Sequence, residues 1–341
     1  MFCLDLSLSD LNAWCEEKGY PKYRAGQIYK WLSSGAIETS EMTNIPKTIR
    51  EQLESDFDFG SFHVIDKFVS KIDGTTKFVY GLADGNVIET VVMRYKTGLS
   101  VCISSQAGCR MGCRFCASAK AGFGRNLTSG EMLAQVIVSQ KQMGEKISKV
   151  VVMGIGEPFE NYDNFIGFVK LINSPDGMNL GARHITVSTC GLVPRIKDFT
   201  ELGLQVNLAV SLHAPNDELR RKIMPIANKY TIAEVLAACR EYTQKTGRRI
   251  TYEYSLFDGV NDSLEDAKAL AGLLKGELAH VNLIAANEFP GSEFKRSPRK
   301  NVKAFEEALK RYGINATLRR EMGTDIMAAC GQLRRSVEED K

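Results

Sequence analysis

The chain has 341 residues, of which 44% are hydrophobic and 25% charged, and its formal net charge is only +3. This composition is typical of a globular protein with a sizeable core, and it excludes a low-complexity or fibrous chain. A charge so close to neutral also means that any binding of nucleic acid must depend on local basic patches.

Cysteine usage and the N-terminus bear on the compartment. Nine cysteines are spread unevenly along the chain, which argues against a framework of disulfides. The N-terminus, Met-Phe-Cys-Leu-Asp-Leu, has neither the basic stretch nor the sustained apolar stretch of a signal peptide. No run of residues approaches the roughly 20 apolar positions of a membrane span. We therefore expect a protein of the reducing cytoplasm that does not engage a membrane.

The first 96 residues divide into a helical part and a β-rich part. Residues 8–55 carry apolar side chains at helical spacing and predict short helices. Alternating runs follow, joined by Asp-Gly pairs that favour hairpin turns, and they predict a small β-meander. These runs are residues 62–71, 76–82 and 87–94.

After residue 98 the pattern becomes strand followed by helix, repeated. Three of the helices are predicted to begin with capping boxes, at Thr128, Thr231 and Ser263. Apolar strands that alternate with helices predict βαβ units and a parallel sheet. Seven repeats favour a partial barrel over a closed eight-fold one. The predicted strands are residues 100–103, 149–153, 184–188, 205–211, 250–256, 280–284 and 314–319.

The predicted fold class is therefore α/β, a partial (β/α) barrel with a small accessory part at the N-terminus. We expect a helical accessory domain over residues 1–60 and a β-meander connecting region over residues 61–96. The partial barrel, with a catalytic C-terminal segment, is expected over residues 97–341.

A cysteine triplet follows the first predicted barrel strand. Cys109, Cys113 and Cys116 have the spacing C-x3-C-x2-C. Three thiolates can hold three irons of a [4Fe–4S] cube, which leaves the fourth iron open to an exogenous ligand. Reductive cleavage of S-adenosylmethionine (SAM), a carrier of radical chemistry, requires such an open iron. The alternative is a structural zinc site, but zinc takes four ligands, usually from C-x2-C pairs, and no second pair flanks the triplet.

Other polar residues fall at the predicted ends of the barrel strands. In parallel α/β folds the ligand lies at the carboxyl ends of the strands. The run Gly154-Ile-Gly156-Glu157-Pro158 follows the second strand, and Ser188 ends the third. Ser211-Leu212-His213 ends the fourth strand, and Asn287 lies just past the sixth. We expect these residues to converge on the cysteine triplet.

Several motifs carry a resemblance to a known family. They are Cys102-Ile-Ser-Ser-Gln-Ala-Gly-Cys109, the cysteine triplet, Gly122-Phe-Gly-Arg-Asn-Leu-Thr128, Met153-Gly-Ile-Gly-Glu-Pro158, Ile185-Thr-Val-Ser-Thr189, Val210-Ser-Leu-His-Ala-Pro215, Gly259-Val-Asn-Asp262, Ala328-Ala-Cys-Gly-Gln-Leu333 and, near the N-terminus, Tyr23-Arg-Ala-Gly-Gln-Ile-Tyr-Lys-Trp-Leu32. On these motifs the chain resembles the RlmN/Cfr family of radical SAM RNA adenosine methyltransferases, over most of its length and in one order.

The resemblance implies a radical methylation of adenine, whose C2 and C8 carbons are poor nucleophiles. One SAM methylates Cys330, and a second SAM, bound to the open iron, is cleaved to a 5′-deoxyadenosyl radical. That radical takes a hydrogen from the methyl group, and the resulting methylene radical adds to adenine to form a covalent adduct. Cys102 resolves the adduct and leaves a Cys102–Cys330 disulfide that must be reduced. Glu89 occupies the position of the family's proposed general base.

The resemblance also implies the cofactor contacts and partners. Gly156 and Glu157 are expected at the methionyl amine of SAM, and the sulfonium, ribose and adenine are expected against Ser188, Ser211, Leu212, His213 and Asn287. The substrate is 23S rRNA and, in some bacteria, also tRNA. An electron donor such as flavodoxin or ferredoxin supplies the reducing equivalents.

Alternatives remain open at this point. Glu157-Pro158 and the run from Gly122 favour RlmN-type methylation of C2, whereas Cfr-type enzymes methylate C8 of the same rRNA adenosine and confer antibiotic resistance. A zinc-containing RNA-binding protein without catalysis is a further alternative. Cys330 and Cys102 could be packed thiols, and Glu89 an exposed strand residue. The chain departs from the family at Ala285-Ala286, Met327 and Cys190.

RNA contacts are the least defined feature. Basic clusters occur at Arg220-Arg221-Lys222, Lys295-Arg296, Arg299-Lys300 and Arg319-Arg320, and each fits a solvated face as well as an RNA contact. Aromatic and basic residues of the helical part, including Tyr23, Arg24 and Tyr29, could form an RNA platform or a hydrophobic core.

Overall fold

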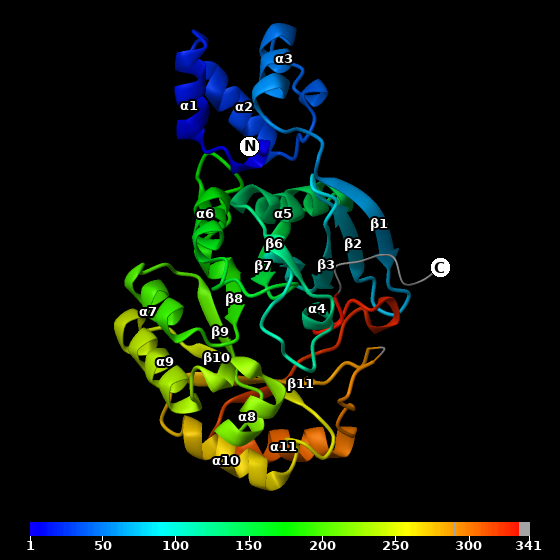
Figure 1. Ribbon diagram of the computed structural model, residues 1–341, viewed down its shortest axis with the longest axis vertical. Helices are drawn as coiled ribbons and strands as arrows, with labels where there is room; N and C mark the ends of the chain where they lie inside the picture. The colour runs from blue at the N-terminus through cyan, green and yellow to red at the C-terminus, as the bar shows by residue number, and fades with distance from the viewer. Residues whose placement is uncertain (290, 334–341) are drawn as a thin grey trace.

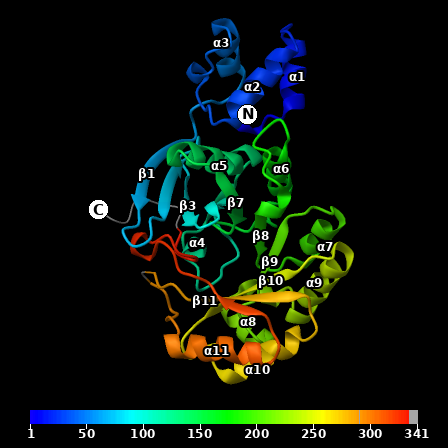
Figure 2. The same cartoon turned by 180° about the vertical axis from the view of Figure 1, so that it is seen from behind.

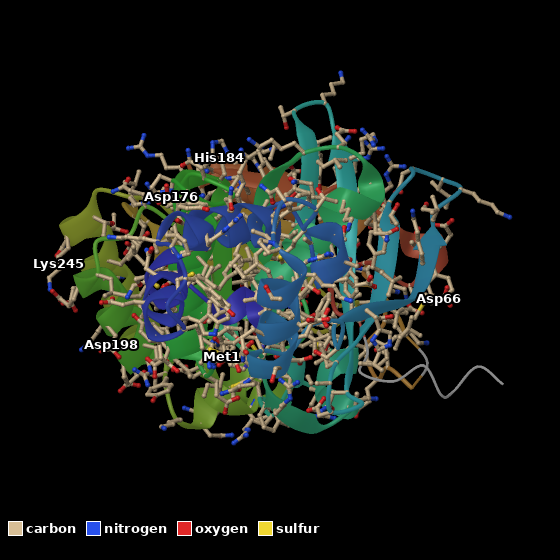
Figure 3. The ribbon with its side chains drawn as sticks, turned by 90° about the horizontal axis from the view of Figure 1, so that it is seen from above. Met1, Asp66, Asp176, His184, Asp198 and Lys245 are labelled. Carbon is tan, nitrogen blue, oxygen red and sulfur yellow. The ribbon has the colours of Figure 1, made fainter. Side chains whose placement is uncertain are left out.

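The start of the chain folds into helices, as the spacing of its apolar residues predicts. The computed structural model describes residues 1–289 and 291–333. The helices α1 (Leu8–Glu17), α2 (Tyr23–Ser33) and α3 (Lys47–Asp56), with the short turns η1 (Cys3–Asp5) and η2 (Thr39–Glu41), form a cap at one end of the molecule (Figure 1). Seen from above, this cap lies over the sheet, and charged side chains such as Asp66 and Lys245 lie at the rim (Figure 3).

Within the described residues, ten strands form one sheet, in the order β1-β2-β3-β4-β7-β8-β9-β10-β11-β12. The first four are antiparallel neighbours, and every neighbouring pair from β4 to β12 is parallel. Their bounds are β1 (His63–Val69), β2 (Thr76–Gly81), β3 (Val87–Tyr95), β4 (Gly98–Ile103), β7 (Ile147–Val152), β8 (Ile185–Thr189), β9 (Asn207–Ser211), β10 (Ile250–Leu256), β11 (Ala279–Ala285) and β12 (Ala316–Leu318).

Helices alternate with the parallel strands and cover their outer side (Figures 1 and 2). They are α5 (Ser129–Met143), α6 (Tyr162–Asn173), α7 (Val193–Glu201), α8 (Asp217–Ile223), α9 (Ile232–Thr246), α10 (Leu264–Leu274) and α11 (Arg299–Arg311), with the 3-10 turns η3 (Ala182–His184), η4 (Pro225–Asn228) and η5 (Thr324–Ile326). None of the helices in the described ranges is both long enough and apolar enough to cross a membrane.

The predicted α/β fold with a parallel sheet is confirmed. Each of the seven predicted barrel strands overlaps an observed parallel strand, and the capping boxes at Thr128, Thr231 and Ser263 are present. The meander is also present, but β3 pairs with β4, so one sheet runs without interruption across residue 96. A short ribbon of β5 (Gln106–Gly108) and β6 (Phe123–Asn126), with α4 (Ala117–Lys120) between them, was not predicted.

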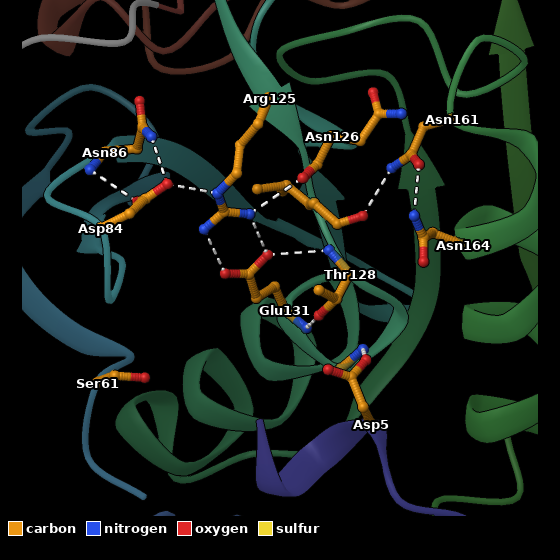
Figure 4. A network of polar contacts seen from close by, with 12 residues as sticks. Asp5, Ser61, Asp84, Asn86, Arg125, Asn126, Thr128, Glu131, Asn161 and Asn164 are labelled. Atoms are coloured by element: carbon orange, nitrogen blue, oxygen red, sulfur yellow. Dashed lines mark hydrogen bonds and ion pairs between the residues drawn. The ribbon is translucent and has the colours of Figure 1, made fainter. Parts of the chain in front are cut away.

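A polar network ties the meander to the barrel (Figure 4). The Arg125 guanidinium donates two hydrogen bonds of 2.7 Å to the Glu131 carboxylate and a third to Asp84, in the turn between β2 and β3. The Arg125 side chain holds the pKa of Asp84 well below the usual range. Glu131 also accepts from the Thr128 N–H at the start of α5 (2.9 Å). One guanidinium therefore joins the meander, β6 and α5.

The cap is fastened to the same helix end. The Asp5 carboxylate accepts a hydrogen bond of 2.5 Å from the N–H of Gly130, in the first turn of α5, where helix donors have no intrahelical partner. A Cβ on Gly130 would lie only 2.4 Å from the Asp5 nitrogen, so this close approach requires glycine. The first turn of α5 thus receives both the cap and the network of Arg125.

Arg125→Met is expected to lower the free energy of unfolding by about 2 kcal/mol, because it leaves the nearly buried Glu131 carboxylate unpaired. We keep the figure below that of a fully buried pair because the Arg125 side chain is 31% exposed. Urea unfolding measures the change. The matched control is Arg94→Met, whose ion pair with Glu145 lies at the surface, and it is expected to change stability by less than about 0.5 kcal/mol. Equal losses in the two variants would contradict this account.

Candidate active site

The loop that carries the cysteine triplet is held by two backbone hydrogen bonds and begins at a glycine turn. It joins β5 to β6 through the bond from the Cys109 N–H to the Gly122 carbonyl (3.0 Å). The Arg114 N–H donates to the Ile223 carbonyl at the end of α8 (3.0 Å). Gly108 has a φ of +85°, and a Cβ there would lie 1.9 Å from the Gly122 oxygen. Only glycine therefore permits the loop to leave β5 in this way.

The three thiols line one cavity, at the carboxyl ends of the parallel strands. Burial raises the pKa of Cys109 to about 12 and that of Cys113 well above its usual value, so both are protonated without a cation. A bound metal reverses this preference and deprotonates its thiol ligands.

The donor set fits a [4Fe–4S] cluster with three protein thiolates, and Cys109, Cys113 and Cys116 would hold it. Within residues 1–289 and 291–333, no three His, Cys, Asp or Glu side chains meet closely enough to hold a single ion. The thiolates of a cube bind separate irons and need no common point.

The predicted residues do converge on this cavity. Besides the cysteines, it is lined by Gly156, Glu157, Ser188, Ser211, His213, Asn287 and Cys330. Leu212 is buried and is not among the described residues that line the cavity. The strand ends thus bring together residues separated by more than 200 positions in the sequence.

Glu157 is a buried carboxylate at the edge of the cavity. One of its oxygens accepts a hydrogen bond from the Cys190 N–H (2.7 Å) and the other from the Phe159 N–H (2.9 Å). Burial raises its pKa, and these bonds oppose the rise. The carboxylate is therefore fixed in orientation between the ends of β7 and β8. Cys190 lines the cavity too.

His213 is a neutral imidazole whose tautomer is fixed. Its Nδ1 accepts a hydrogen bond from the Ser255 N–H (2.9 Å), so Nε2 carries the proton. Burial, reinforced by the charge of Arg220, lowers its pKa to about 3. The ring also meets the edge of Phe115, in the cysteine loop, with centroids 4.8 Å apart. His213 is thus a hydrogen-bond donor that does not change charge near neutral pH.

A second cavity adjoins the first and contains Cys102. Cys330, Asn287 and Arg319 line both cavities. Burial raises the pKa of Cys102 to about 12, the charge of Cys330 adds to the rise, and Arg319 opposes it. Cys330 is the largest cause of the raised pKa of Arg319. Cys102 is therefore close enough to Cys330 for their charges to interact, and Arg319 lies near both thiols.

Glu89 lies on β3 beside the second cavity. Its carboxylate is 2.8 Å from the Lys77 ammonium, and both side chains are nearly buried. Glu89 points to the same face of the sheet as Val91, which pairs with Cys102 and lines the cavity. Glu89 itself is not among the described residues that line either cavity.

The segment that carries Cys330 is docked onto the cysteine loop. The Ala117 N–H donates to the Gly331 carbonyl (2.9 Å), and the Ser118 hydroxyl donates to the Leu333 carbonyl (2.8 Å). The Asn287 amide donates to the Cys330 carbonyl (3.2 Å). Met327 has a φ of +51°, a left-handed conformation that a long side chain such as Met rarely adopts. The backbone is therefore strained three residues before Cys330.

Sequence reasoning missed three charged residues of the site. Arg319 was grouped with an RNA-contacting or solvated cluster, yet it faces both cavities. Glu253 lines the first cavity from the middle of β10, and burial raises its pKa. Arg220 is wholly buried beside the strand ends. For Glu253 a signal existed, because a carboxylate within a strand of a parallel sheet lies in the interior.

Two family models match the chain. The model described as the ribosomal RNA large subunit methyltransferase N-terminal domain matches residues 3–58, and that of the radical SAM superfamily matches residues 103–271. A protein of Clostridium perfringens strain 13, named "Probable dual-specificity RNA methyltransferase RlmN", is 54% identical over 99% of this chain and 98% of its own length. A protein of Clostridium novyi with the same name is 52% identical over 98% and 97% of the two chains.

A solved structure also matches over nearly the whole chain. The crystal structure of a radical SAM methyltransferase from Sphaerobacter thermophilus superposes with a TM-score of 0.94 at 45% identity. The match covers 98% of this chain and 99% of that one.

The lowered pKa of His213 predicts a loss of stability in mild acid. Its folded pKa lies below the unfolded value of about 6.5, so its contribution is complete above that value and is lost as the pH falls toward 3. Between pH 7 and 5 this amounts to about 2 kcal/mol of unfolding free energy. Urea unfolding at the two pH values measures it, and His213→Asn should remove that part of the pH dependence. An unchanged dependence in the variant would contradict a buried neutral imidazole.

Proposed function

Because the chain belongs to the RlmN family of radical SAM methyltransferases, we propose that it methylates C2 of an adenosine in 23S rRNA and, as a second substrate, in tRNA. The observation that carries the proposal is the position of Cys330, which lines both the cavity of the cysteine triplet and the cavity of Cys102. The proposed role requires this position. Cys330 has to accept a methyl group from SAM in one cavity, and its adduct with RNA has to be cleaved by a second thiol in the other.

The first cavity is proposed to hold SAM on the cluster of Cys109, Cys113 and Cys116. When bound, the cluster supplies the electron that cleaves SAM to a carbon radical, and two SAM molecules are used in each turnover. Glu157 is fixed by two backbone N–H groups and is proposed to face the methionyl ammonium, with Gly156 beside it. Ser188, Ser211, His213 and Asn287 line the remainder of the SAM site, and Leu212 supports it from behind.

Cys330 is proposed to carry the methyl group and Cys102 to release the product. Both reactions need a thiolate, since the thiolate and not the thiol is the nucleophile. Burial opposes ionisation of Cys102, and Arg319 is the cation that favours it. Because Arg319 lines both cavities, it can serve the two thiols in turn without moving away from either.

Glu89 is proposed as the base that removes the proton from the substituted ring carbon. It lies on the strand next to that of Cys102, and its side chain points to the same face of the sheet. The Lys77 ammonium at 2.8 Å holds the carboxylate in place. A base that an ion pair already holds in place loses less conformational entropy when the substrate binds.

The cap is proposed to be an RNA-contacting domain over residues 1–60, joined by the meander, residues 61–96, to the catalytic barrel, residues 97–341. Of the two tyrosines considered for RNA contact, Tyr29 is in the core, whereas Tyr23 is 60% exposed. The Arg24 guanidinium lies 4.9 Å from the centre of the Tyr23 ring, a pair suited to stacking on an unpaired base. We also propose that the protein works in the cytoplasm and receives its electrons from a donor of the flavodoxin or ferredoxin type.

The test is nucleoside mass spectrometry of a 23S rRNA fragment, treated with reconstituted, reduced enzyme and SAM. The expected product is 2-methyladenosine. Cys330→Ala should abolish it, and Glu89→Gln should lower its rate by at least about 100-fold, as expected for loss of a general base. Cys239→Ala is the matched control, since Cys239 is a buried thiol of α9 outside both cavities, and it should keep the activity.

The outcomes separate the alternatives. A peak of 8-methyladenosine would assign the chain to Cfr-type chemistry. Wild-type product that survives Cys330→Ala would contradict the methyl-carrier role. Absence of both products from enzyme that has an intact cluster and cleaves SAM would contradict the choice of substrate.

A further inference from the structure

Arg220, in α8, is the largest of the fully buried side chains in the described part of the chain, with 0% exposure. Its neighbours Arg221 and Lys222 are exposed, so the basic cluster that the sequence shows is not one surface. A side chain without solvent access cannot contact an RNA phosphate. The adjacent basic residues suggest an RNA contact, but the buried position of Arg220 requires a different explanation.

The guanidinium makes its hydrogen bonds to backbone carbonyls. It donates to the carbonyls of Cys190 (2.7 Å) and Ser211 (3.2 Å), at the ends of β8 and β9, and to those of Leu212 (3.3 Å) and Tyr230 (3.4 Å). No ion pair joins it to a carboxylate of the described residues. These four bonds occupy all but one of the five N–H donors and do not cancel the positive charge, and a buried charge without a counterion is costly.

Two of the groups around Arg220 that can carry negative charge, Cys190 and Cys113, line the cavity of the cysteine triplet. Its electrostatic neighbours are, in order, Cys190, Cys113, Asp217 and Cys239. Cys113 has Arg220 as its cationic neighbour and Cys116, Cys109 and Glu157 as anionic ones. The fold keeps this relation fixed, because the Arg114 N–H bonds to the Ile223 carbonyl of the same short helix.

We propose that Arg220 is the built-in countercharge of the iron–sulfur site and that it favours the one-electron reduction of the cluster. The inference rests on the proposed function, in that Cys113 is taken as a cluster ligand. An external donor supplies the electron, the cluster with its three thiolates becomes more negative by one unit, and Arg220 keeps its proton throughout. A nearby buried cation stabilises the more negative state more strongly, and net charge is one of the factors that set the potential of such clusters.

Arg220 is a positioning residue in this account, because nothing places it in contact with substrate or cofactor. Its carbonyl bonds also hold the ends of β8 and β9 together, and this structural role alone would not require a charge. The two roles separate by substitution. Arg220→Lys keeps the charge and loses most of the bonds, whereas Arg220→Gln keeps a donor and loses the charge.

The experiment is a redox titration with dithionite of the anaerobically reconstituted protein, without SAM or RNA, followed by electron paramagnetic resonance. At a fixed potential, Arg220→Gln is expected to have at least a tenfold lower ratio of reduced to oxidised cluster, a shift of about 59 mV for one electron. Arg220→Lys should stay close to the wild type. Arg221→Gln, the exposed neighbour on the same helix, is the matched control and should not shift.

Asp217→Asn provides a test that leaves Arg220 in place. The new amide oxygen can still accept the bond that the Ile232 N–H makes to Asp217 (2.7 Å), while a negative charge near the guanidinium is removed. The ratio of reduced to oxidised cluster should therefore rise. If Arg220→Gln does not fold, an unchanged or lower ratio in this variant still contradicts the inference.

A wild-type ratio in Arg220→Gln with full iron content would overturn the inference and reduce Arg220 to a structural tie. An unchanged or lower ratio in Asp217→Asn would overturn it as well. Failure of the wild-type protein to assemble about four irons per chain would instead contradict the proposed cluster, and so the proposed function.

Discussion

Two hydrogen bonds fasten the last described segment of the chain to the cysteine loop, from the Ala117 N–H to the Gly331 carbonyl and from the Ser118 hydroxyl to the Leu333 carbonyl. This docking places Cys330 where it lines both cavities, beside α4. The parallel sheet brings the residues of the first cavity to one edge, and the antiparallel pairing of β3 with β4 puts Glu89 on the strand next to that of Cys102, which lines the second cavity. The proposed chemistry depends on this docking.

Much of this arrangement could be predicted from the sequence. Alternation of strands and helices and the Asp-Gly turns gave the barrel strands and the meander, because those patterns reflect burial on one or two faces. The ribbon of β5 and β6 was missed because strands of three and four residues are too short to show a period. The boundary near residue 96 marks a change from antiparallel to parallel pairing, and it does not interrupt the sheet, since β3 and β4 hydrogen-bond directly.

The charged residues of the site were harder to predict. Arg220 and Arg221 are adjacent in the sequence and look alike, but one is wholly buried and the other is exposed. Burial of an arginine depends on which carbonyls the fold brings to it, and those of Cys190 and Ser211 come from two different strands. For the same reason the sequence did not predict that Arg319 lines both cavities. Its position depends on the pairing of β12 with β11. The roles of Cys330 and Cys102 were predicted only from the resemblance of the surrounding motifs to a known family.

The central claim is that Cys330 and Cys102 act in sequence on one substrate from adjoining cavities. Peptide mass spectrometry after a single turnover without thiol reductant tests it most directly. The account predicts a peptide pair linked through Cys102 and Cys330, formed in proportion to the methylated adenosine. Methylated RNA accompanied by two free thiols, or by a disulfide that involves any other cysteine, would contradict it.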